Sequence, residues 1–321
     1  MLQNRTITVM TLNAYVGTNL GPLFSTTATQ LPIRVTEVFR QFLATNIPSR
    51  VNGFAAEIKR ARPDIVGLYE MDIVQLLAPS GSGAPSATYD FLNLLLKALR
   101  RMGLHYRVIA IGKNYDGLAP ASTGYTVRLF DRNIILARRG APLSFSNVQN
   151  FNFNQNTVIT LGGRPFPILH GFSTVDVVAY GKKFRFAAAH LDGYTASVRF
   201  AQVNQLIRTL ANPPLPVVLV GDFNSNALRN GRVYRRVLRA GYTDAWTQKG
   251  IGPGPTYGFD YDLLNVGNSL FERVDYILYK GKKAFTVRKI FREGQTQRAR
   301  IPSSPLWPSD TASVVAQLRL N

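Results

Sequence analysis

The sequence has no cysteine, few acidic residues and only three histidines, and each shortage excludes a kind of chemistry. Without cysteine, the chain forms no disulfide, no thiolate zinc site and no cysteine nucleophile. With no thiolate and little imidazole, a metal site in this chain would depend on hard oxygen ligands. A long apolar run is also lacking, since no segment approaches the roughly 20 apolar residues that a membrane-spanning helix needs.

The shortage of acids makes the chain strongly basic. Its 321 residues include 38 Lys and Arg against 18 Asp and Glu, which gives a formal net charge of +20. A positive field of this size attracts partners that carry phosphate, such as nucleic acid, an anionic membrane or a phospholipid. A basic proteome or a solubility function predicts the same charge, so the composition alone leaves the kind of partner open.

The sequence has enough apolar residues for a large core. Hydrophobic residues make up 45% of the chain, and no linker or internal repeat divides it, which predicts one domain over residues 1–321. The first residues, Met1 to Arg5, lead directly into a predicted strand and do not resemble a signal peptide. We therefore expect either a cytoplasmic protein or a secreted bacterial chain whose signal has been removed, the second being weakly favoured. We expect a monomer without a protein partner.

Helices and strands are mixed in both halves of the sequence. Apolar residues at helical spacing predict helices over residues 33–44, 51–61, 89–102, 196–210 and 233–240. Alternating or continuous apolar residues predict strands over residues 6–12, 65–68, 106–111, 133–137, 173–179, 184–189, 217–220, 274–279, 286–290 and 312–318. This mixture predicts an α/β fold in which two packed sheets are flanked by helices.

Several of the scarce carboxylates occur at or near the ends of predicted buried strands. Glu70 follows Ile-Val-Gly-Leu-Tyr, Asp222 follows Val-Val-Leu-Val-Gly, and Asp275 lies within Arg-Val-Asp-Tyr-Ile-Leu. Similar positions are occupied by Asn13, His190 and Asn224. Taken singly, each residue can be a loop cap or a turn former. Converging carboxylates would repel one another unless a cation joined them, so the set predicts a site for Mg²⁺, Mn²⁺ or Ca²⁺.

These residues lie in blocks that resemble the endonuclease/exonuclease/phosphatase superfamily, in the same order. The blocks are Thr11–Asn13, Arg62–Glu70, Asp131–Ala137, His190–Asp192, Gly221–Asn224, Arg273–Tyr276 and Ser309–Asp310. The superfamily includes abasic-site endonucleases, pancreatic-type deoxyribonucleases, neutral sphingomyelinases and inositol polyphosphate phosphatases. The resemblance covers nearly the whole chain. It implies a four-layer α/β/β/α sandwich of two mixed sheets flanked by helices, with one cleft at the strand ends.

The resemblance also implies a metal centre. Glu70 is expected to be the principal metal ligand, with Asn13 and Asp310 beside the metal. The cofactor would be Mg²⁺, or alternatively Mn²⁺ or Ca²⁺. Asn133, within the block Asp131–Ala137, is expected to bind substrate.

The remaining residues of the resemblance would act on a phosphodiester. Asp222 is expected to position or deprotonate the attacking water, and Asn224 to orient the phosphate. His190 is expected to contact the phosphate or to protonate the leaving oxygen. Asp275 is expected to hold a second histidine near the C-terminus. In-line attack on a phosphodiester needs these functions: an activated water, a cation on the developing charge and help for the leaving group.

One residue departs from the superfamily pattern. Its last block reads Ser-Asp-His, whereas this chain has Ser309-Asp310-Thr311, and no histidine follows His190. Threonine carries no positive charge and cannot shuttle a proton near neutral pH. We expect a loss of roughly 10²–10⁴ in rate relative to a histidine-containing relative. Three explanations stay open: an inactivating change, a natural non-catalytic binder, or chemistry that depends on the metal, Asp222 and His190 alone.

Nucleic acid is the substrate class that the sequence favours. Arg232, Arg235, Arg236 and Arg239 share one side of a predicted helix that begins shortly after Asn224. If this face points to the rim of the cleft, Arg232 and Arg236 are expected to bind a polyanion. A solvated helix face that points away from the cleft is the alternative.

A lipid phosphodiesterase is the rival enzyme. Phe145, Phe151, Phe153 and the loop over residues 257–271 would then form a membrane-facing surface. The asparagines around these phenylalanines also fit a packed loop. Exposure of the aromatic side chains beside the cleft is the feature that separates the two interpretations. A scaffold that binds DNA, membrane or protein without catalysis is the third possibility.

Overall fold

The fold was obtained from a computed structural model, which describes residues 5–79, 84–212, 214–281, 283–302 and 304–321. The expectation about compartment depends in part on Met1 to Asn4, which lie outside the described residues. Within these ranges, every helix is too short or too polar to cross a membrane.

The first sheet has eight strands and is mixed. Its strand order is β15 (Phe285–Glu293), β16 (Ser313–Leu320), β1 (Thr6–Asn13), β2 (Ile65–Tyr69), β6 (Thr126–Arg138), β3 (Ile73–Leu77) and β4 (Ala87–Asp90), and β5 (Tyr106–Pro120) also pairs with β6. The pair β1–β2 is parallel, and the other pairs are antiparallel. The helices of this half are α1 (Leu31–Ala44), α2 (Ile47–Ala61) and α3 (Phe91–Arg101), with the short turn η1 (Gly21–Leu23) before them.

The second sheet has six strands and is also mixed. Its order is β13 (Thr243–Asp244), β14 (Asp275–Lys280), β12 (Val217–Asp222), β11 (Lys182–His190), β10 (Gly171–Ala179) and β7 (Leu143–Asn152). Only β11 and β12 run parallel. A separate hairpin consists of β8 (Thr157–Leu161) and β9 (Arg164–Ile168). The other elements are α4 (Ala196–Leu210), α5 (Arg232–Arg239), α6 (Ala245–Lys249), η2 (Ala227–Arg229) and η3 (Gln297–Ala299).

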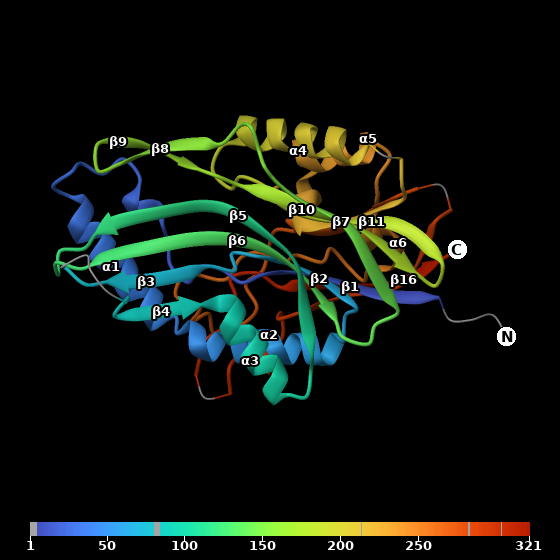
Figure 1. The fold of residues 1–321 in the computed structure, drawn as a ribbon, viewed down its shortest axis with the longest axis horizontal. Helices are drawn as coiled ribbons and strands as arrows, with labels where there is room; N and C mark the ends of the chain where they lie inside the picture. The colour runs from blue at the N-terminus through green and yellow to red at the C-terminus, as the bar shows by residue number, and fades with distance from the viewer. Residues whose placement is uncertain (1–4, 80–83, 213, 282, 303) are drawn as a thin grey trace.

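The alternation of side chains along the central strands produces the layers. In β1, Ile7 and Val9 face a core between the sheets, while Met10 and Leu12 face a core shared with the helices. In β12, Val218 faces the core between the sheets, and its neighbours pack on the other side with α4 and α5. Figure 1 shows α4 and α5 above the sheets and α2 and α3 below them. The predicted four-layer α/β/β/α sandwich is confirmed.

The strand registers bring the polar strand ends to one edge of the sandwich. In the first sheet, Asn13 pairs with Tyr69, the residue before Glu70. In the second sheet, Asp222 lies between His190 on β11 and Asp275 on β14. The residues that the sequence predicted for the metal and phosphate site therefore lie at the ends of strands in both sheets.

Candidate active site

Asn13 joins the two sheets at the centre of the site. Its Nδ2 donates to Oε1 of Glu70 at 2.9 Å and to Oδ2 of Asp222 at 3.1 Å. Its Oδ1 accepts from the backbone N–H of Tyr15 at 2.8 Å, which fixes the orientation of the amide. The backbone N–H of Val16 donates to Oε2 of Glu70 at 2.7 Å. Both carboxylates are therefore oriented by neutral donors.

Two residues of the site have backbones in the left-handed region. The φ angle is 52° at Glu70 and 47° at Asn224, and neither residue is glycine. A side chain in this region is uncommon and costs free energy, most of all for a residue such as glutamate. Such strain persists where the surrounding structure holds it, and it is enriched at functional sites.

Asp222, Asn224 and His190 form a second group beside this centre. The backbone N–H of Asn224 donates to Oδ1 of Asp222 at 2.8 Å. The Nδ2 of Asn224 donates to the carbonyl oxygen of Leu191 at 2.8 Å and lies 3.4 Å from Nε2 of His190. His190 is buried at the end of β11. The structure thus brings the three predicted phosphate-site residues together.

His170 also lies at this site, which the sequence did not reveal. Its ring meets the ring of His190 edge to face, with centroids 4.9 Å apart. Burial, followed by the charge of the neighbouring His190, lowers the pKa of His170 to about 4. Its Nδ1 lies 3.3 Å from the carbonyl oxygen of Ile168, which orients the ring that packs against His190. In the sequence, His170 stands where a predicted strand ends in a turn, and this pattern is also typical of a structural residue.

Asp310 and Asp275 place more negative charge at the same edge. Burial raises the pKa of Asp310 well above its usual value, and the charges of Glu70 and Asp222 raise it further. Burial followed by the charge of Asp222 raises the pKa of Asp275 in the same way. Among the described residues, no basic side chain contacts the carboxylate of Asp275, and the Thr256 hydroxyl partly offsets the rise in its pKa. A buried carboxylate without a charged partner is unfavourable.

Thr311 is buried and lies close to Asp275 through Thr256. The backbone N–H of Asp275 donates to Oγ1 of Thr256 at 3.2 Å, and the N–H of Ala312 donates to its carbonyl oxygen at 2.6 Å. The hydroxyl of Thr311 lies 3.4 Å from Oγ of Ser309. This hydroxyl supplies a neutral hydrogen-bonding group at the position where the resemblance leads us to expect an imidazole.

Arg50 holds two loops beside the site, and the sequence did not predict this role. Its side chain is fully buried, and its Nε donates to the carbonyl oxygen of Pro308 at 2.7 Å. One Nη atom donates to the carbonyl oxygen of Tyr15 at 2.7 Å and also to that of Ala14. Burial lowers the pKa of Arg50 to about 10, so it remains a cation at neutral pH. It ties the loop after β1 to the loop that carries Asp310.

The residues present fit a hard divalent cation. Glu70 and Asp310 lie on neighbouring segments, because the side chain of Asn13 donates to Glu70 and its backbone carbonyl oxygen accepts from Oγ of Ser309 at 2.8 Å. In the described part of the chain, no three His, Cys, Asp or Glu side chains gather as a complete metal cage. Mg²⁺ usually takes one or two carboxylates and keeps several waters, which matches this donor set. Because Asn13 directs its amide nitrogen to both carboxylates, its role as a direct oxygen ligand stays a prediction.

The predicted substrate-binding residues differ in their surroundings. Asn133 is fully buried, and its Nδ2 donates to the carbonyl oxygen of Gly171 at 3.0 Å, which ties β6 to β10. Arg232 lies with its guanidinium carbon 3.8 Å from the ring centre of Phe200 on α4. The Nε of Arg236 donates to Oδ1 of Asn204 on α4 at 2.7 Å. These contacts join α5 to α4 and involve none of the strand-end residues, so substrate binding by both arginines stays a prediction.

The aromatic residues of the lipid interpretation separate into two groups. Phe153 is buried, and Phe151 stacks on Phe172 with ring centroids 4.7 Å apart. Phe145 is partly buried against the core between the sheets. These three phenylalanines belong to β7 and the residue after it, and the expected loop is a strand at this place. In the loop over residues 257–271, by contrast, Phe271 is 59% exposed.

Solved structures with this fold match nearly the whole chain. A family protein from Bacteroides thetaiotaomicron is 16% identical, with a TM-score of 0.63 over 98% of both chains. A mannosyl-6-phosphatase from the same organism is 17% identical, with a TM-score of 0.61 over 97% of this chain and 99% of that chain. D. rerio TDP2, solved with a single-strand DNA product, is 15% identical, with a TM-score of 0.59 over 98% of both chains. These similarities establish a shared fold.

Comparison with known sequences gives the family. No curated protein sequence matches the chain significantly. The sequence profile described as "Endonuclease/Exonuclease/phosphatase family" matches residues 10–310. The chain therefore belongs to the endonuclease/exonuclease/phosphatase family.

Proposed function

We propose that this chain is a divalent-metal-dependent hydrolase of phosphodiesters. The observation that carries the proposal is the hydrogen-bonded link from Glu70 through Asn13 to Asp222, which connects the ends of the two sheets. Membership of the family supports a phosphoesterase in general. The convergence of further carboxylates on one edge supports a requirement for a cation.

Glu70 would hold the cation, with Asp310 beside it. We propose Mg²⁺, with Mn²⁺ or Ca²⁺ as alternatives, because few carboxylates and no cysteine are present. A cation bound there would offset the negative charge that develops on the phosphate oxygens during attack. Asn13 keeps Glu70 and Asp222 in fixed relative positions, since one amide group donates to both.

Asp222 is suited to accept a proton from water. N–H groups of Asn13 and Asn224 donate to its two oxygens and hold the carboxylate in one orientation. In the proposed reaction, the water oxygen forms a bond to phosphorus while its proton passes to Asp222. The bond between phosphorus and the leaving oxygen breaks, and the His190 ring would donate a proton to that oxygen. Asn224, beside His190, would orient the phosphate.

Thr311 is proposed to reduce the rate of this reaction. It is neutral and buried, and it leaves Asp275 without a basic partner. The expected loss is roughly 10²–10⁴ relative to a site with a positioned imidazole. A non-catalytic binder of phosphate or DNA is the alternative function.

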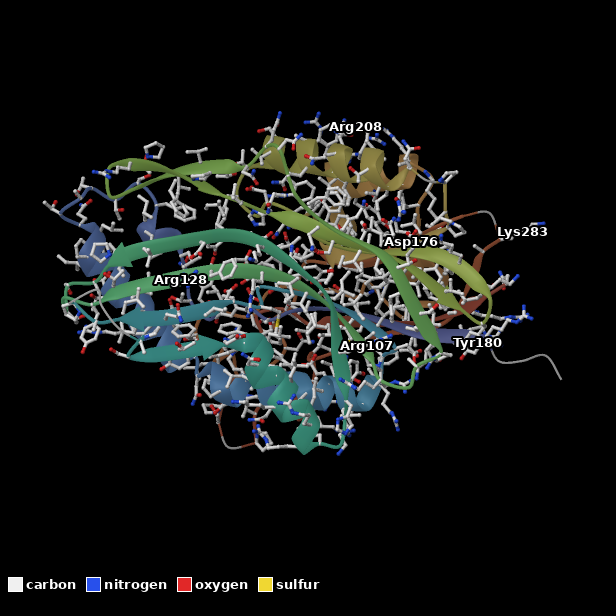
Figure 2. The ribbon with its side chains drawn as sticks, viewed as in Figure 1. Arg107, Arg128, Asp176, Tyr180, Arg208 and Lys283 are labelled. Carbon is white, nitrogen blue, oxygen red and sulfur yellow. The ribbon has the colours of Figure 1, made fainter. Side chains whose placement is uncertain are left out.

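Nucleic acid is the substrate class that the net charge supports. The charge of +20 favours a polyanion, and one relative of the same fold was solved with a single-strand DNA product. Arg128, Arg208 and Lys283 lie at widely separated places in Figure 2, so these three basic residues do not form one patch. The nucleic-acid form of the proposal therefore depends on overall charge.

Turnover of bis-p-nitrophenyl phosphate with Mg²⁺ or Mn²⁺ tests the proposed hydrolysis. We expect slow turnover that a chelator abolishes and that Asp222→Asn lowers by roughly 10²-fold or more. Asp116→Asn is the matched control, because Asp116 pairs with Arg128 on the surface. Turnover no faster than in chelator, from a folded protein, would leave a binding function in place of the enzyme.

A further inference from the structure

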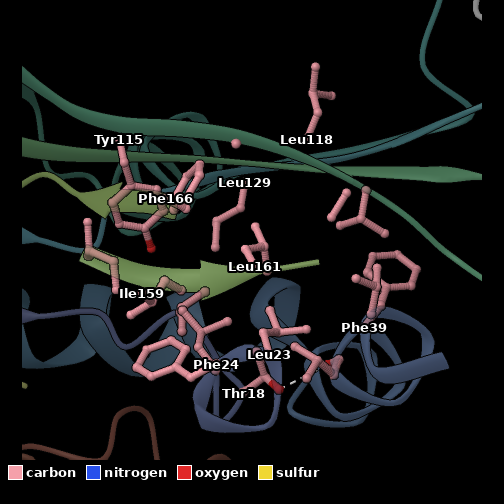
Figure 3. Close-up of a pocket in the computed structure, with 18 of the residues that line it drawn as sticks. Thr18, Leu23, Phe24, Phe39, Tyr115, Leu118, Leu129, Ile159, Leu161 and Phe166 are labelled. Carbon is pink, nitrogen blue, oxygen red and sulfur yellow. Dashed lines mark hydrogen bonds between the residues drawn. The ribbon is translucent and has the colours of Figure 1, made fainter. Parts of the chain in front are cut away.

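An apolar cavity of about 110 Å³ lies beside the candidate metal site. It is lined by residues of η1, α1, the C-terminal part of β5, the N-terminal part of β6, and the hairpin β8–β9 (Figures 1 and 3). Aliphatic and aromatic side chains form nearly the whole wall, among them Phe24, Phe39, Leu129, Leu161 and Phe166. Figure 3 shows these side chains pointing into a common space from different elements.

The few polar groups in the wall do not make it a polar site. The hydroxyl of Thr18 donates to the carbonyl oxygen of Val38 at 2.9 Å, so this residue needs no ligand as a partner. Tyr115 lies edge to face with Phe166, with ring centroids 6.4 Å apart. The cavity therefore suits a hydrocarbon group and offers little to a sugar or a base.

Two residues connect the cavity to the phosphate site. Val16 lines the cavity, and its backbone N–H donates to Oε2 of Glu70 at 2.7 Å. Tyr194 also lines the cavity, and its backbone N–H donates to Oδ1 of Asp192 at 2.9 Å. The residue before it, Gly193, lies against the phosphate site, since a Cβ added there would be 3.4 Å from Oδ1 of Asn224.

Exposed apolar residues continue this surface on both sides of the site. Leu118, in the cavity wall, is 61% exposed, so the cavity opens toward solvent. On the other side, Val266 and Phe271 are 88% and 59% exposed in the loop over residues 257–271. Gln41 on α1 lines a groove with this loop, while Val38 and Phe42 of the same helix line the cavity. The groove also contains Asp260 and Asp262, so exposed apolar residues lie on both sides of the site with polar side chains between them.

We propose that the apolar cavity binds the hydrocarbon chain of an amphiphilic phosphoester whose phosphate lies at Glu70. The inference rests on the proposed phosphodiester hydrolysis, and it names an amphiphile in place of nucleic acid as the substrate class. The hydrocarbon chain of the substrate would enter the cavity past Val16 and Tyr194 and displace water from the apolar wall. A nucleic acid would leave this cavity empty, because its sugars and bases offer no long hydrocarbon.

A series of p-nitrophenyl alkyl phosphodiesters, with methyl, butyl and octyl esters below their micelle-forming concentrations, tests the inference. We expect kcat/KM to rise about fourfold per methylene until the cavity is full, which corresponds to about 0.8 kcal/mol for each buried methylene. The ratio of octyl to methyl kcat/KM should fall to about one in Leu161→Trp, because the larger side chain on β8 would occupy the cavity. Val158→Trp, on the same strand with an exposed side chain, should keep the ratio. Ala119→Leu is a smaller filling change if Leu161→Trp does not fold.

The outcomes separate this inference from the proposed hydrolysis. Turnover of the methyl ester without any gain from chain length overturns the inference and leaves the hydrolysis intact. If no ester is turned over, the hydrolysis fails, and calorimetric binding of dodecyl phosphate decides the inference. Binding that Leu161→Trp weakens at least tenfold supports the chain site, and equal binding by both proteins overturns it. Strong competition by a single-strand oligonucleotide, with no effect of chain length, would favour nucleic acid.

Discussion

Restoring an imidazole at position 311 should raise the activity of the enzyme. Asp275 is buried, and within the described structure its carboxylate has no basic partner. Thr256 contacts the backbone of Asp275 and of Ala312, so positions 275 and 311 lie close together. In Thr311→His, the new ring would gain Asp275 as an acceptor and would add a cationic donor at the phosphate site.

The size of the effect follows from these contacts. A hydrogen bond to a charged group contributes about 1.5–3 kcal/mol, enough to orient the ring and favour its protonated form. A positioned acid contributes roughly 10²–10⁴ in rate, so Thr311→His should raise kcat by about 10² or more. The gain should appear in kcat with little change in KM, because the interaction strengthens as charge develops.

Turnover of bis-p-nitrophenyl phosphate by three variants measures the effect. Thr311→Asn controls for side-chain size without a titratable ring and should show no gain. The double change Thr311→His with Asp275→Asn should show a reduced gain, because the ring loses its charged acceptor. A folded Thr311→His protein that is no faster on any phosphodiester would refute the role assigned to the missing histidine.

Three further results are expected. Burial raises the pKa of Glu57 to about 7, so the folded protein binds this proton more tightly than the unfolded chain does, and the free energy of unfolding falls as pH rises from 4.5 to about 7. Glu57→Gln should therefore raise the free energy of unfolding at about pH 8, by up to roughly 3 kcal/mol in denaturant titrations, and change it little below about pH 4.5. An equal effect of the substitution at both pH values would contradict this. Arg50→Met should lower the free energy of unfolding by roughly 3 kcal/mol, because three carbonyl oxygens lose their donor, whereas the exposed control Arg34→Met should change it by less than about 1 kcal/mol. If nucleic acid is the ligand, its affinity should fall roughly a thousandfold over a fourfold rise in salt, and binding that salt leaves unchanged would count against that ligand.

The sequence predicted the central strands and the edge at which the site lies. In β1, β2, β11 and β12, local alternation or apolar runs coincide with burial, and polar residues stand where each strand ends. The pairing of His190 with Asp222 and of Asp222 with Asp275 then follows from strand register. Strand positions and the polar residues at strand ends depend on the local sequence, so the pattern of a single sequence was enough to predict them.

Other features depend on distant contacts and were missed. The hairpin β8–β9 contains two prolines and little alternation, and it is positioned by η1 and α1, whose side chains close the cavity with it. Arg50 lies on a helix where an arginine usually faces solvent, and only the loops after β1 and before Asp310 give it buried acceptors. Such partners are separated by many residues along the chain, so periodicity does not reveal them.

Calorimetric titration with Mn²⁺ is the most direct test of the central claim that Glu70 holds a divalent cation. The wild-type protein should bind one ion, and Glu70→Ala should abolish the binding or weaken it at least tenfold. Glu37→Ala is the control, since Glu37 pairs with Arg34 on the exposed face of α1, and it should bind as the wild type does. Unchanged Mn²⁺ binding by a folded Glu70→Ala protein would contradict the assignment of the metal centre and the hydrolysis proposed from it.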